Sequence, residues 1–543
     1  MEMRNIIDLE IDSAPDTSSQ SSVTAGRDTP DSEPSFHEND FMSDEDFDLY
    51  VTGLALSATI SNPQSGLHLH SIPRQSIPKY TAQGRTFTPG KSVELNDGTF
   101  LRITKLLEGQ DGVVFCGRRL ERLETMDSLM PDRLNELCWI VDRGGQYTDD
   151  EIEVPLEDVK RLRIIRLTNR PYTPESTNQF QSLSECREQG YLFCRLKYIR
   201  TWNNKNRVVE DAIEYLAPEE CVDSISSNVL RQKWRGERGD NQCHYTFGDG
   251  FCGGGGVSRG AAQAGLQLSW AFDHNVAAMN SYRLNFPDSI GETCDVADFL
   301  TNRPEDVRVV ILHLSPPCQP FSPAKTIAAA TDDANQACIF SIHQLLELIK
   351  PRIVTMEETS GLIERHKEFL YATIHTFVEL GYSVRWKVLQ SEEFGVPQRR
   401  KRLIIIASGP GETLPPFPLP THGPSSNNLS PYVTIMDAIG DIPSSAPNHD
   451  LDRAQRSFFR QPYDPDTLAK TITCNGGDNV HPSGTRTFTH RELASLQTFP
   501  IEHQFCAPGV MKQIGNAVPP VLAKAIFMEV LKSLRRTDAT VID

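Results

Sequence analysis

A single cysteine, Cys318, stands between prolines in the stretch "HLSPPCQPFS" (313–322), directly after the apolar run "VRVVIL". Buried cysteines are common in protein cores, where no reaction is needed to explain them. A cysteine on a proline-rich loop at the end of a predicted strand is a different case, because a thiolate there can act as a nucleophile. Cys318 is therefore the first candidate for a catalytic residue.

A glycine-rich turn, "FGDGFCGGGGVSRG" (247–260), is the second candidate feature. Its four consecutive glycines lie between a predicted strand and a predicted helix, where a ligand can approach bare backbone at a helix N-terminus. A linker is the alternative interpretation. Asp273 ends the next predicted strand, "LQLSWAFD", at the place of an acid that accepts hydrogen bonds from ribose hydroxyls. The spacing fits a dinucleotide or S-adenosylmethionine equally well.

Strand-like and helix-like segments alternate from residue 240 to 408, and this pattern must position both features. The predicted strands are "HYTFGD", "LQLSWAFD", "VRVVILHLS", "RIVTMEE", "YSVRWKVLQ" and "RLIIIAS". Such alternation is typical of a doubly wound parallel α/β sheet, which binds ligands at the carboxyl ends of its strands. Cys318 lies at one such end.

Six blocks in this order closely resemble the cytosine-5 DNA methyltransferase family: "FGDGFCGGGG", "SPPCQPFS", "TMEETSG", "FGVPQRRKRLIIIAS", "RELASLQTFP" and "QIGNAVPP". The resemblance implies a Rossmann-like α/β domain, S-adenosyl-L-methionine as cofactor and DNA as substrate. Within the family, "SPPCQPFSPAKT" and "EET" look most like the fungal branch linked to premeiotic repeat methylation and repeat-induced point mutation.

The resemblance also implies roles for single residues. Cys318 would form a covalent bond to C6 of a cytosine that is flipped out of the duplex, and Glu357 would hold N3 and the exocyclic amine. Arg402 would face the base O2, with Arg400 close by. A nuclear-import or phosphate-binding patch is the alternative interpretation of "QRRKR". The implied cofactor residues are Asp249, Phe251, Gly253, Gly255, Gly256, Asp273, His274, Asp295, Val296, Asn516, Ala517 and Val518.

One block departs from the family pattern, because Glu357-Glu358-Thr359 stands where the family has Glu-Asn-Val. If Glu358 shared a pocket with Glu357, the two carboxyls would not both ionise easily. The change would also be able to disturb the loop that carries Cys318. A methyltransferase-like scaffold that binds DNA or chromatin partners with little turnover is thus one alternative. An RNA cytosine-5 methyltransferase is another, although the regions before the catalytic part favour chromatin over tRNA.

The regions around the catalytic part are predicted from composition. Residues 1–50 hold 14 Asp and Glu against 2 Arg, a net charge of −12, which leaves −6 of the total −18 for the other 493 residues. We expect residues 1–85 to be a disordered acidic tail. Residues 86–215 contain short β-like runs and resemble bromo-adjacent-homology (BAH) modules, although a β-domain that merely packs on its neighbour explains the runs as well. The catalytic domain follows at 240–408, a small target-recognition region at 409–488, and the C-terminal part of the catalytic domain at 489–543.

Composition also bounds the compartment and the partners. The chain has no run of about 18 apolar residues and begins with an acidic segment, so we expect a soluble, intracellular protein that does not work at a membrane. The resemblance implies that it works in the nucleus. DNA is the expected partner, and chromatin or histone-associated proteins are candidates through the N-terminal region. The 12 cysteines form no CxxC pair, so no metal is expected. The sequence does not indicate the oligomeric state.

Overall fold

A computed structural model describes residues 74–542 of the chain, except 111, 148–149, 173–181, 237–244, 303–306, 318–340, 425–427, 455–460 and 475–479, and except the side chains of 127 and 540–542. All described residues belong to one compact unit, Ile72–Asp543. The predicted nucleophile Cys318 and most of the predicted acidic tail lie outside the described residues.

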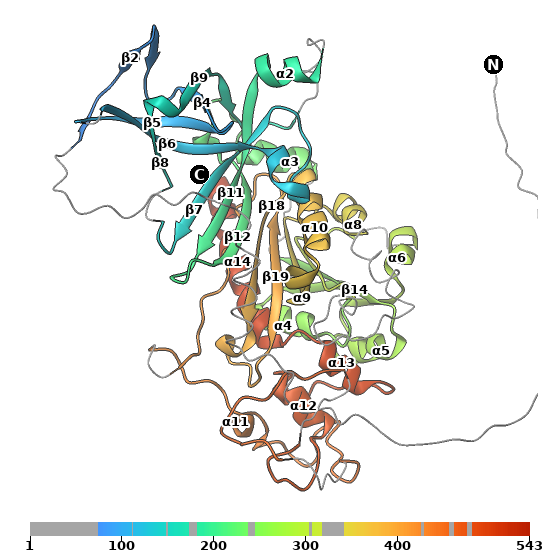
Figure 1. Cartoon of the computed structure of the whole chain (residues 1–543). Helices are drawn as coiled ribbons and strands as arrows, with labels where there is room; N and C mark the ends of the chain where they lie inside the picture. Colours follow the sequence, from blue (N-terminus) through green and yellow to red (C-terminus); the bar gives the residue numbers. More distant parts are fainter. Residues whose placement is uncertain are drawn as a thin grey trace, which may run out of the picture. The chain divides into compact units, whose positions relative to one another are not determined.

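Strands of 2 to 11 residues make up the N-terminal part of this unit, and most but not all of their pairs are antiparallel (Figure 1). Strands β4 to β7 pair in sequence order, β9 pairs with the free side of β4, and β6 also pairs with β8. Residues from β4, β5 and β6 form a separate apolar core on one face of these strands. The elements are β1 (Gln75–Ser76), β2 (Tyr80–Ala82), β3 (Arg85–Phe87), β4 (Ser92–Leu95), β5 (Phe100–Gly109), β6 (Gly112–Arg122), β7 (Glu136–Gly144), β8 (Ile152–Pro155), β9 (Val159–Arg163), β10 (Ile165–Leu167), α2 (Leu183–Gln189), β11 (Leu192–Trp202), β12 (Val208–Tyr215) and α3 (Ser227–Arg235).

The predicted strand–helix alternation is present in the catalytic part. Its elements are β13 (Thr246–Gly250), α4 (Gly256–Ala264), β14 (Gln267–Asp273), α5 (Val276–Asn285), β15 (Ile290–Thr293), α6 (Val296–Asn302), β16 (Ile311–Leu314), α8 (Ile342–Ile349), β17 (Ile353–Thr359), α9 (Gly361–Arg365), α10 (Lys367–Glu379), β18 (Ser383–Gln390) and β19 (Lys401–Ser408). Strands β15, β14, β13, β16 and β17 lie side by side and parallel.

The sheet is not parallel throughout, which corrects the prediction. Strand β19 runs antiparallel to both β17 and β18. A parallel pair needs a crossover of about a dozen residues or more, usually with a helix, and the connection between β18 and β19 is the short segment 391–400. The sheet is therefore mixed, with its parallel strands on the side that carries the glycine turn.

This sheet continues into the N-terminal strands. Strand β12 pairs antiparallel with β18, with Ala212 opposite Arg385. The Arg385 guanidinium forms ion pairs with Glu210 and Glu214 of β12, at 3.1 and 3.2 Å. The N-terminal strands and the catalytic sheet thus share backbone hydrogen bonds and charged contacts.

The last part of the chain returns to the catalytic sheet (Figure 1). Helices α11 (Ile435–Ile439), α12 (His490–Leu496) and α13 (Val510–Asn516) share an apolar core, and α14 (Pro520–Ile542) packs along α4. A Cβ atom at Gly260 of α4 would lie 2.5 Å from the carbonyl oxygen of Pro520, so this close packing requires glycine. The stretch Val510–Ala539 is long and apolar enough to cross a membrane, but 61% of its most apolar window is buried in the protein.

Candidate active site

The glycine turn after β13 has the left-handed backbone that its sequence permits. Gly253 and Gly255 have φ angles of 53° and 85°, and Phe251 has a φ of 61°, which is rare for a residue with a side chain. A Cβ atom at Gly256 would lie 2.5 Å from the carbonyl oxygen of Val518. The turn is therefore shaped both by its own conformation and by close contact with the block "NAV" (516–518).

A cavity of about 300 Å³ opens at this turn. It lies at the carboxyl ends of the parallel strands, as predicted. Ten of the predicted site residues contribute to its wall: Asp249, Phe251, Gly253, Gly256, Asp273, His274, Glu357, Asn516, Ala517 and Val518. Gly255 does not line the cavity, but it is the N-cap residue of α4.

Asp273 holds the glycine turn in place. One of its carboxylate oxygens accepts a hydrogen bond from the Gly253 amide at 2.9 Å, and the other accepts from the Asn275 amide at 2.8 Å. His274 is more exposed, with its Nδ1 3.6 Å from the Asp273 carboxylate. Both residues reach the cavity from the end of β14, where the resemblance places contacts to the cofactor.

Asp249 carries an oxygen that lacks a hydrogen-bond partner. Its Oδ2 accepts from the Ser258 hydroxyl at 2.6 Å, and that hydroxyl lies 3.1 Å from the Tyr282 hydroxyl. Its Oδ1 is buried and has no partner among the described residues. Burial raises the pKa of Asp249 to about 7, although the Ser258 hydrogen bonds oppose this. An acceptor in this position fits a ligand that carries an amino group, as S-adenosyl-L-methionine does.

Asp295 and Val296 do not line the cavity. The Asp295 carboxylate accepts a hydrogen bond from the Asp298 amide at 2.8 Å and so caps α6. The Val296 side chain is buried in the apolar core beside Phe299. The structure therefore gives both side chains a structural task, which differs from the predicted cofactor contact.

Glu357 and Arg402 form an ion pair at the edge of the cavity. The distance from Arg402 Nε to Glu357 Oε1 is 2.5 Å, and both side chains are largely buried. In the β17–β19 register Glu357 lies opposite Ile404, and Arg402 lies two residues before Ile404 on the same face of the sheet. Pro316 and Pro317, which precede Cys318, line the same cavity. The predicted carboxylate and guanidinium are thus brought together next to the loop that carries the predicted nucleophile.

Arg400 has a different task from the one predicted. Its buried guanidinium donates to the carbonyl oxygens of Ile472, Gly515 and Ala517, at 3.1, 2.9 and 2.9 Å. These carbonyls belong to two separate segments that meet beside the cavity. Arg400 therefore positions the block that forms the cavity wall, because its donors are engaged with backbone and not with Glu357.

Glu358 does not share the cavity with Glu357, which corrects the expectation of a common pocket. Adjacent residues of a strand point to opposite faces, and Glu358 lies opposite Leu403 on the face that carries the apolar core. Its side chain is fully buried, and its Oε1 has no partner among the described residues. Burial, followed by the nearby charge of Glu357, raises the pKa of Glu358 well above its usual range. Glu358 is thus held as a neutral acid.

Several residues at the cavity were not singled out from the sequence. Lys512 and Gln513 line it from α13, and Gln513 accepts from the Ser281 hydroxyl at 2.6 Å. His313 lies behind the cysteine loop, with ring nitrogens 2.7 Å from Ser315 Oγ and 2.8 Å from Thr355 Oγ1. Burial lowers the pKa of His313 to about 3, so it is neutral. Gln513 lies inside the block "QIGNAVPP". For His313, the sequence indicated only a position in a predicted strand.

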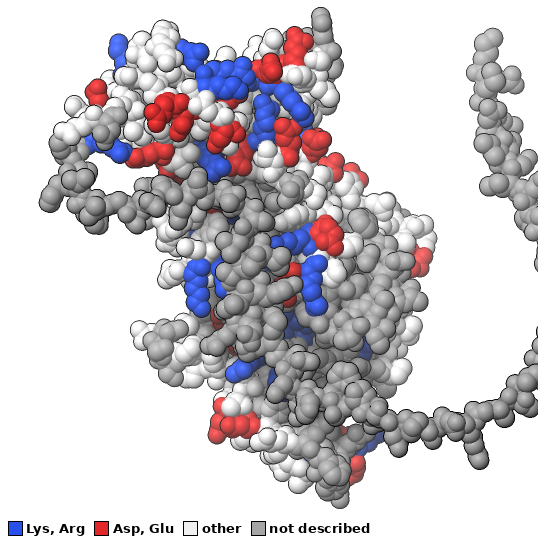
Figure 2. All heavy atoms as spheres, viewed as in Figure 1, with Lys and Arg blue, Asp and Glu red and all other residues white. Residues whose placement is uncertain are grey.

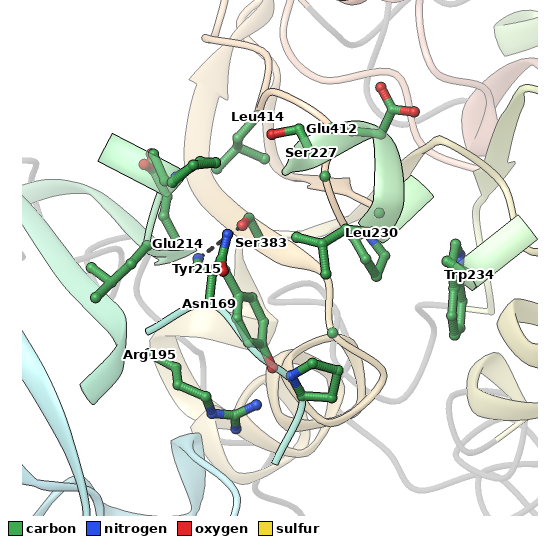
Figure 3. A pocket seen from close by; sticks show the side chains of 18 of the residues that line it. Asn169, Arg195, Glu214, Tyr215, Ser227, Leu230, Trp234, Ser383, Glu412 and Leu414 are labelled. Atoms are coloured by element: carbon green, nitrogen blue, oxygen red, sulfur yellow. Dashed lines mark hydrogen bonds between the residues drawn. The ribbon is translucent and has the colours of Figure 1, made fainter. Parts of the chain in front are cut away.

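A larger cavity, of about 710 Å³, lies elsewhere, between the N-terminal strands, α3 and the segment after β19 (Figure 3). Its wall includes Arg195, Tyr215 and Trp234. Of the predicted site residues that the structure describes, none contributes to it. The smaller cavity is therefore the candidate active site, because the chemically competent groups converge there.

Comparison with known proteins agrees with this site. The model of the C-5 cytosine-specific DNA methylase family matches residues 245–461 and 452–532. The type II methyltransferase M1.HphI of Haemophilus parahaemolyticus is 31% identical over 330 residues, which cover 53% of this chain and 87% of that protein. The DNA (cytosine-5)-methyltransferase PliMCI of Paracentrotus lividus is 28% identical over 299 residues, 48% of this chain and 18% of that protein.

Among solved structures, a putative DNA modification methyltransferase from an Escherichia coli prophage has a TM-score of 0.43 and 20% identity, and covers 54% of this chain and 99% of that one. The family match extends over more than half of the chain. The chain belongs to the C-5 cytosine-specific DNA methylase family. It is accordingly a DNA (cytosine-5)-methyltransferase that takes its methyl group from S-adenosyl-L-methionine.

Proposed function

We propose that this enzyme methylates C5 of a cytosine flipped out of DNA through a covalent adduct of Cys318, and that it acts in the nucleus in premeiotic silencing of repeated sequences. The observation that carries the chemical part is the Glu357–Arg402 ion pair, which stands at the cavity beside Pro316 and Pro317. It supplies a carboxyl and a guanidinium at the position where the resemblance requires them.

Each residue has one task in this proposal. The Cys318 thiolate adds to C6 of the cytosine, which makes C5 nucleophilic. Glu357 holds N3 and the exocyclic amine, while Arg402 stabilises the negative charge that develops on O2. After methylation, C5 loses its hydrogen as a proton, and the bond between C6 and sulfur breaks to release the thiolate. Glu357 and Arg402 already contact each other, so little reorganisation is needed when the base enters.

The cofactor residues follow from the geometry of the cavity. The bound cofactor supplies an electrophilic methyl group. The glycine turn and the N-terminus of α4 would accommodate its polar end, and Asp249 Oδ1 would accept from its amino group. The close contact of Gly256 with Val518 would hold the block 516–518 over the methionine portion. Ribose hydroxyls would lie near Asp273 and His274.

The biological part of the proposal is supported by sequence features. The blocks "SPPCQPFSPAKT" and "EET" look most like those of the fungal branch linked to premeiotic repeat methylation and repeat-induced point mutation. The β-rich part before the catalytic sheet resembles a BAH module, for which chromatin or histone-associated proteins are the expected partners. A nuclear location accords with DNA as substrate.

A covalent trap tests the chemical proposal. The full chain is incubated with S-adenosyl-L-methionine and matched DNA and RNA duplexes that contain 5-fluorocytosine, which lacks the hydrogen that must leave. We expect a covalent complex with DNA, and none with RNA or with the Cys318→Ala variant. An adduct on RNA alone, or on DNA with the variant, contradicts the proposal. Methyl transfer to a plasmid with a duplicated insert, compared with a single-copy plasmid of equal length, tests the preference for repeats.

A further inference from the structure

Two arginines of the N-terminal strands face each other directly, Arg102 on β5 and Arg118 on β6. Like charges at directly opposed positions destabilise an antiparallel pair. Both side chains are half-buried, and neither forms an ion pair with a carboxylate within the part of the chain that the structure describes. Burial, and then the charge of Arg118, lower the pKa of Arg102. No carboxylate among the described residues therefore compensates the repulsion between these two charges.

Both arginines are held firmly in this position. A Cβ atom at Gly117 would lie 2.1 Å from the carbonyl oxygen of Arg102, so glycine is required for the two strands to approach here. Arg102 donates to the Ser92 hydroxyl at 3.3 Å, and the Arg118 guanidinium stacks over the Trp139 ring, 4.1 Å from its centroid. The pair of positive charges is thus part of the fold.

Trp139 holds Arg118 by stacking and does not itself reach an external anion. The residue is 6% exposed, and its indole nitrogen is buried. The groups that an anion with several oxygen atoms would reach are therefore the two half-buried guanidinium groups.

Neighbouring cations on the same sheet, unlike Arg102 and Arg118, form ion pairs with a carboxylate. Glu94 on β4 forms ion pairs with Lys160, Arg161 and Arg163 of β9, at 2.8 to 2.9 Å. Figure 2 shows Lys and Arg gathered over the N-terminal strands, with Asp and Glu among them. Glu94 thus neutralises cations of β9, whereas Arg102 and Arg118 have no carboxylate partner among the described residues.

We infer that Arg102 and Arg118, the latter held by the Trp139 ring, form a phosphate-binding site that holds the backbone of substrate DNA outside the catalytic cavity. DNA is the favoured anion because it is the polyanionic substrate of this family, and its phosphate oxygens accept from guanidinium donors. The site would contribute affinity without sequence preference. The inference rests on DNA as the substrate and is independent of the roles given to Cys318, Glu357 and Arg402.

The test uses the full chain with both arginines changed, Arg102→Gln and Arg118→Gln, because glutamine keeps much of the apolar stem. Affinity for a duplex of about 40 base pairs is measured by fluorescence anisotropy across a salt series. Each lost phosphate contact lowers the salt slope by about 0.9, so we expect a decrease of about 1.8 and about tenfold weaker binding. Turnover of a saturating duplex of about 12 base pairs should stay within about twofold, since the catalytic cavity is unchanged.

Arg119→Gln is the matched control, because Arg119 is the next residue on β6, points to the other face and pairs with Glu121 at 2.7 Å. It should leave the salt slope unchanged. Trp139→Phe keeps an aromatic ring under Arg118 and removes only a buried N–H, so we expect affinity within about twofold of the wild type. Melting curves identify variants that fail to fold. If the double variant fails, the single variants Arg102→Gln and Arg118→Gln are compared with the wild type.

Three results would overturn the inference. They are a wild-type salt slope in the double variant, an equal loss with Arg119→Gln, and competition by an acidic peptide as effective as that by DNA of equal charge. If the 5-fluorocytosine adduct still forms normally alongside any of these results, the phosphate-binding site is rejected and the proposed function stands.

Discussion

The two faces of β17 carry adjacent carboxyl groups in opposite surroundings. Glu357 lies on the cavity face and pairs with Arg402, whereas Glu358 lies on the core face opposite Leu403. The residue types are identical and the positions differ by one. Because side chains alternate along a strand, this single step separates a charged site from an apolar core. The comparison shows that the departure "EET" adds a buried neutral acid behind the site, not a second carboxylate in it.

The same contrast applies to Arg400 and Arg402 of the next strand. Arg402 meets Glu357 at the cavity, and Arg400 is bound by three backbone carbonyls. One arginine thus pairs with a residue of the cavity wall, and the other positions the backbone around the cavity. We therefore expect a substitution of Glu357 to differ in outcome from one of Glu358. The same holds for Arg402 and Arg400.

The largest effect is expected for Cys318→Ala. This change should abolish methyl transfer and the covalent adduct while leaving cofactor affinity within about twofold, because the thiol bonds to the base and not to the cofactor. Adduct formation is measured by denaturing electrophoresis, and affinity by calorimetry. Residual turnover near the wild-type rate would assign the nucleophile to another residue.

Glu357→Gln and Glu358→Gln test the two faces of β17 directly. We expect the first to lower the single-turnover rate by about 10²–10⁴, the range for groups that transfer or hold a proton. The second should change the rate by less than about threefold, since its side chain does not reach the cavity. A larger loss with Glu358→Gln than with Glu357→Gln would reverse the assignment.

Arg402→Ala and Arg400→Ala should separate chemistry from architecture. Arg402→Ala should slow the chemical step by about 10²-fold with little change in the melting temperature. Arg400→Ala removes a buried cation from three carbonyls and should lower the free energy of unfolding by about 2–4 kcal/mol, with weaker cofactor binding. Denaturant titration and single-turnover kinetics distinguish the two. If Arg400→Ala slows chemistry at full stability and cofactor occupancy, the originally predicted catalytic role returns.

Asp249 predicts a pH dependence of cofactor binding. Burial raises the pKa of Asp249 to about 7, and a cationic amino group beside Oδ1 would favour the ionised form. Affinity for the cofactor should therefore rise as the pH increases towards 7 and then level off, by up to about tenfold per pH unit. Asp249→Asn should flatten this dependence. Asp273→Asn is the control, because Asp273 accepts from two backbone amides and its loss should weaken binding at every pH.

The sequence was sufficient for the order of elements and for most of the cavity wall. Glycine turns, strand ends and short sequence blocks are local features, and Phe251, Asp273, Glu357 and Asn516, which they indicated, line the cavity. Side-chain direction was harder to predict. Asp295 caps a helix instead of lining the cavity because its partner is only three residues away, a contact that competes with any ligand.

Long-range contacts were out of reach of the sequence. The antiparallel insertion of β19, the pairing of β12 with β18 and the carbonyls that bind Arg400 all join segments far apart in the chain. No local sequence pattern indicates which distant strands will pair or which distant carbonyl groups will bind a side chain. The opposite orientation of the Glu357 and Glu358 side chains on β17 is predictable from the sequence, because it requires only the strand assignment and the alternation of side chains.

The smallest effect on activity is expected for the pair Glu358→Asn and Thr359→Val, which restores the family pattern behind the site. The raised pKa of Glu358 means that the folded protein keeps a proton that the unfolded chain loses above about pH 4.5. Stability is therefore reduced as the pH rises from 4.5 towards the folded pKa, and the variant should be free of this loss. We expect equal melting temperatures near pH 4 and a variant more stable by a few degrees at pH 7–8. The pH profile of methyl transfer should be the same in both proteins, because neither the ion pair of Glu357 nor the cavity changes. A shifted activity profile with unchanged melting temperatures would show that the Glu358 carboxyl reaches the reacting base, and the separation of the two faces of β17 would then be wrong.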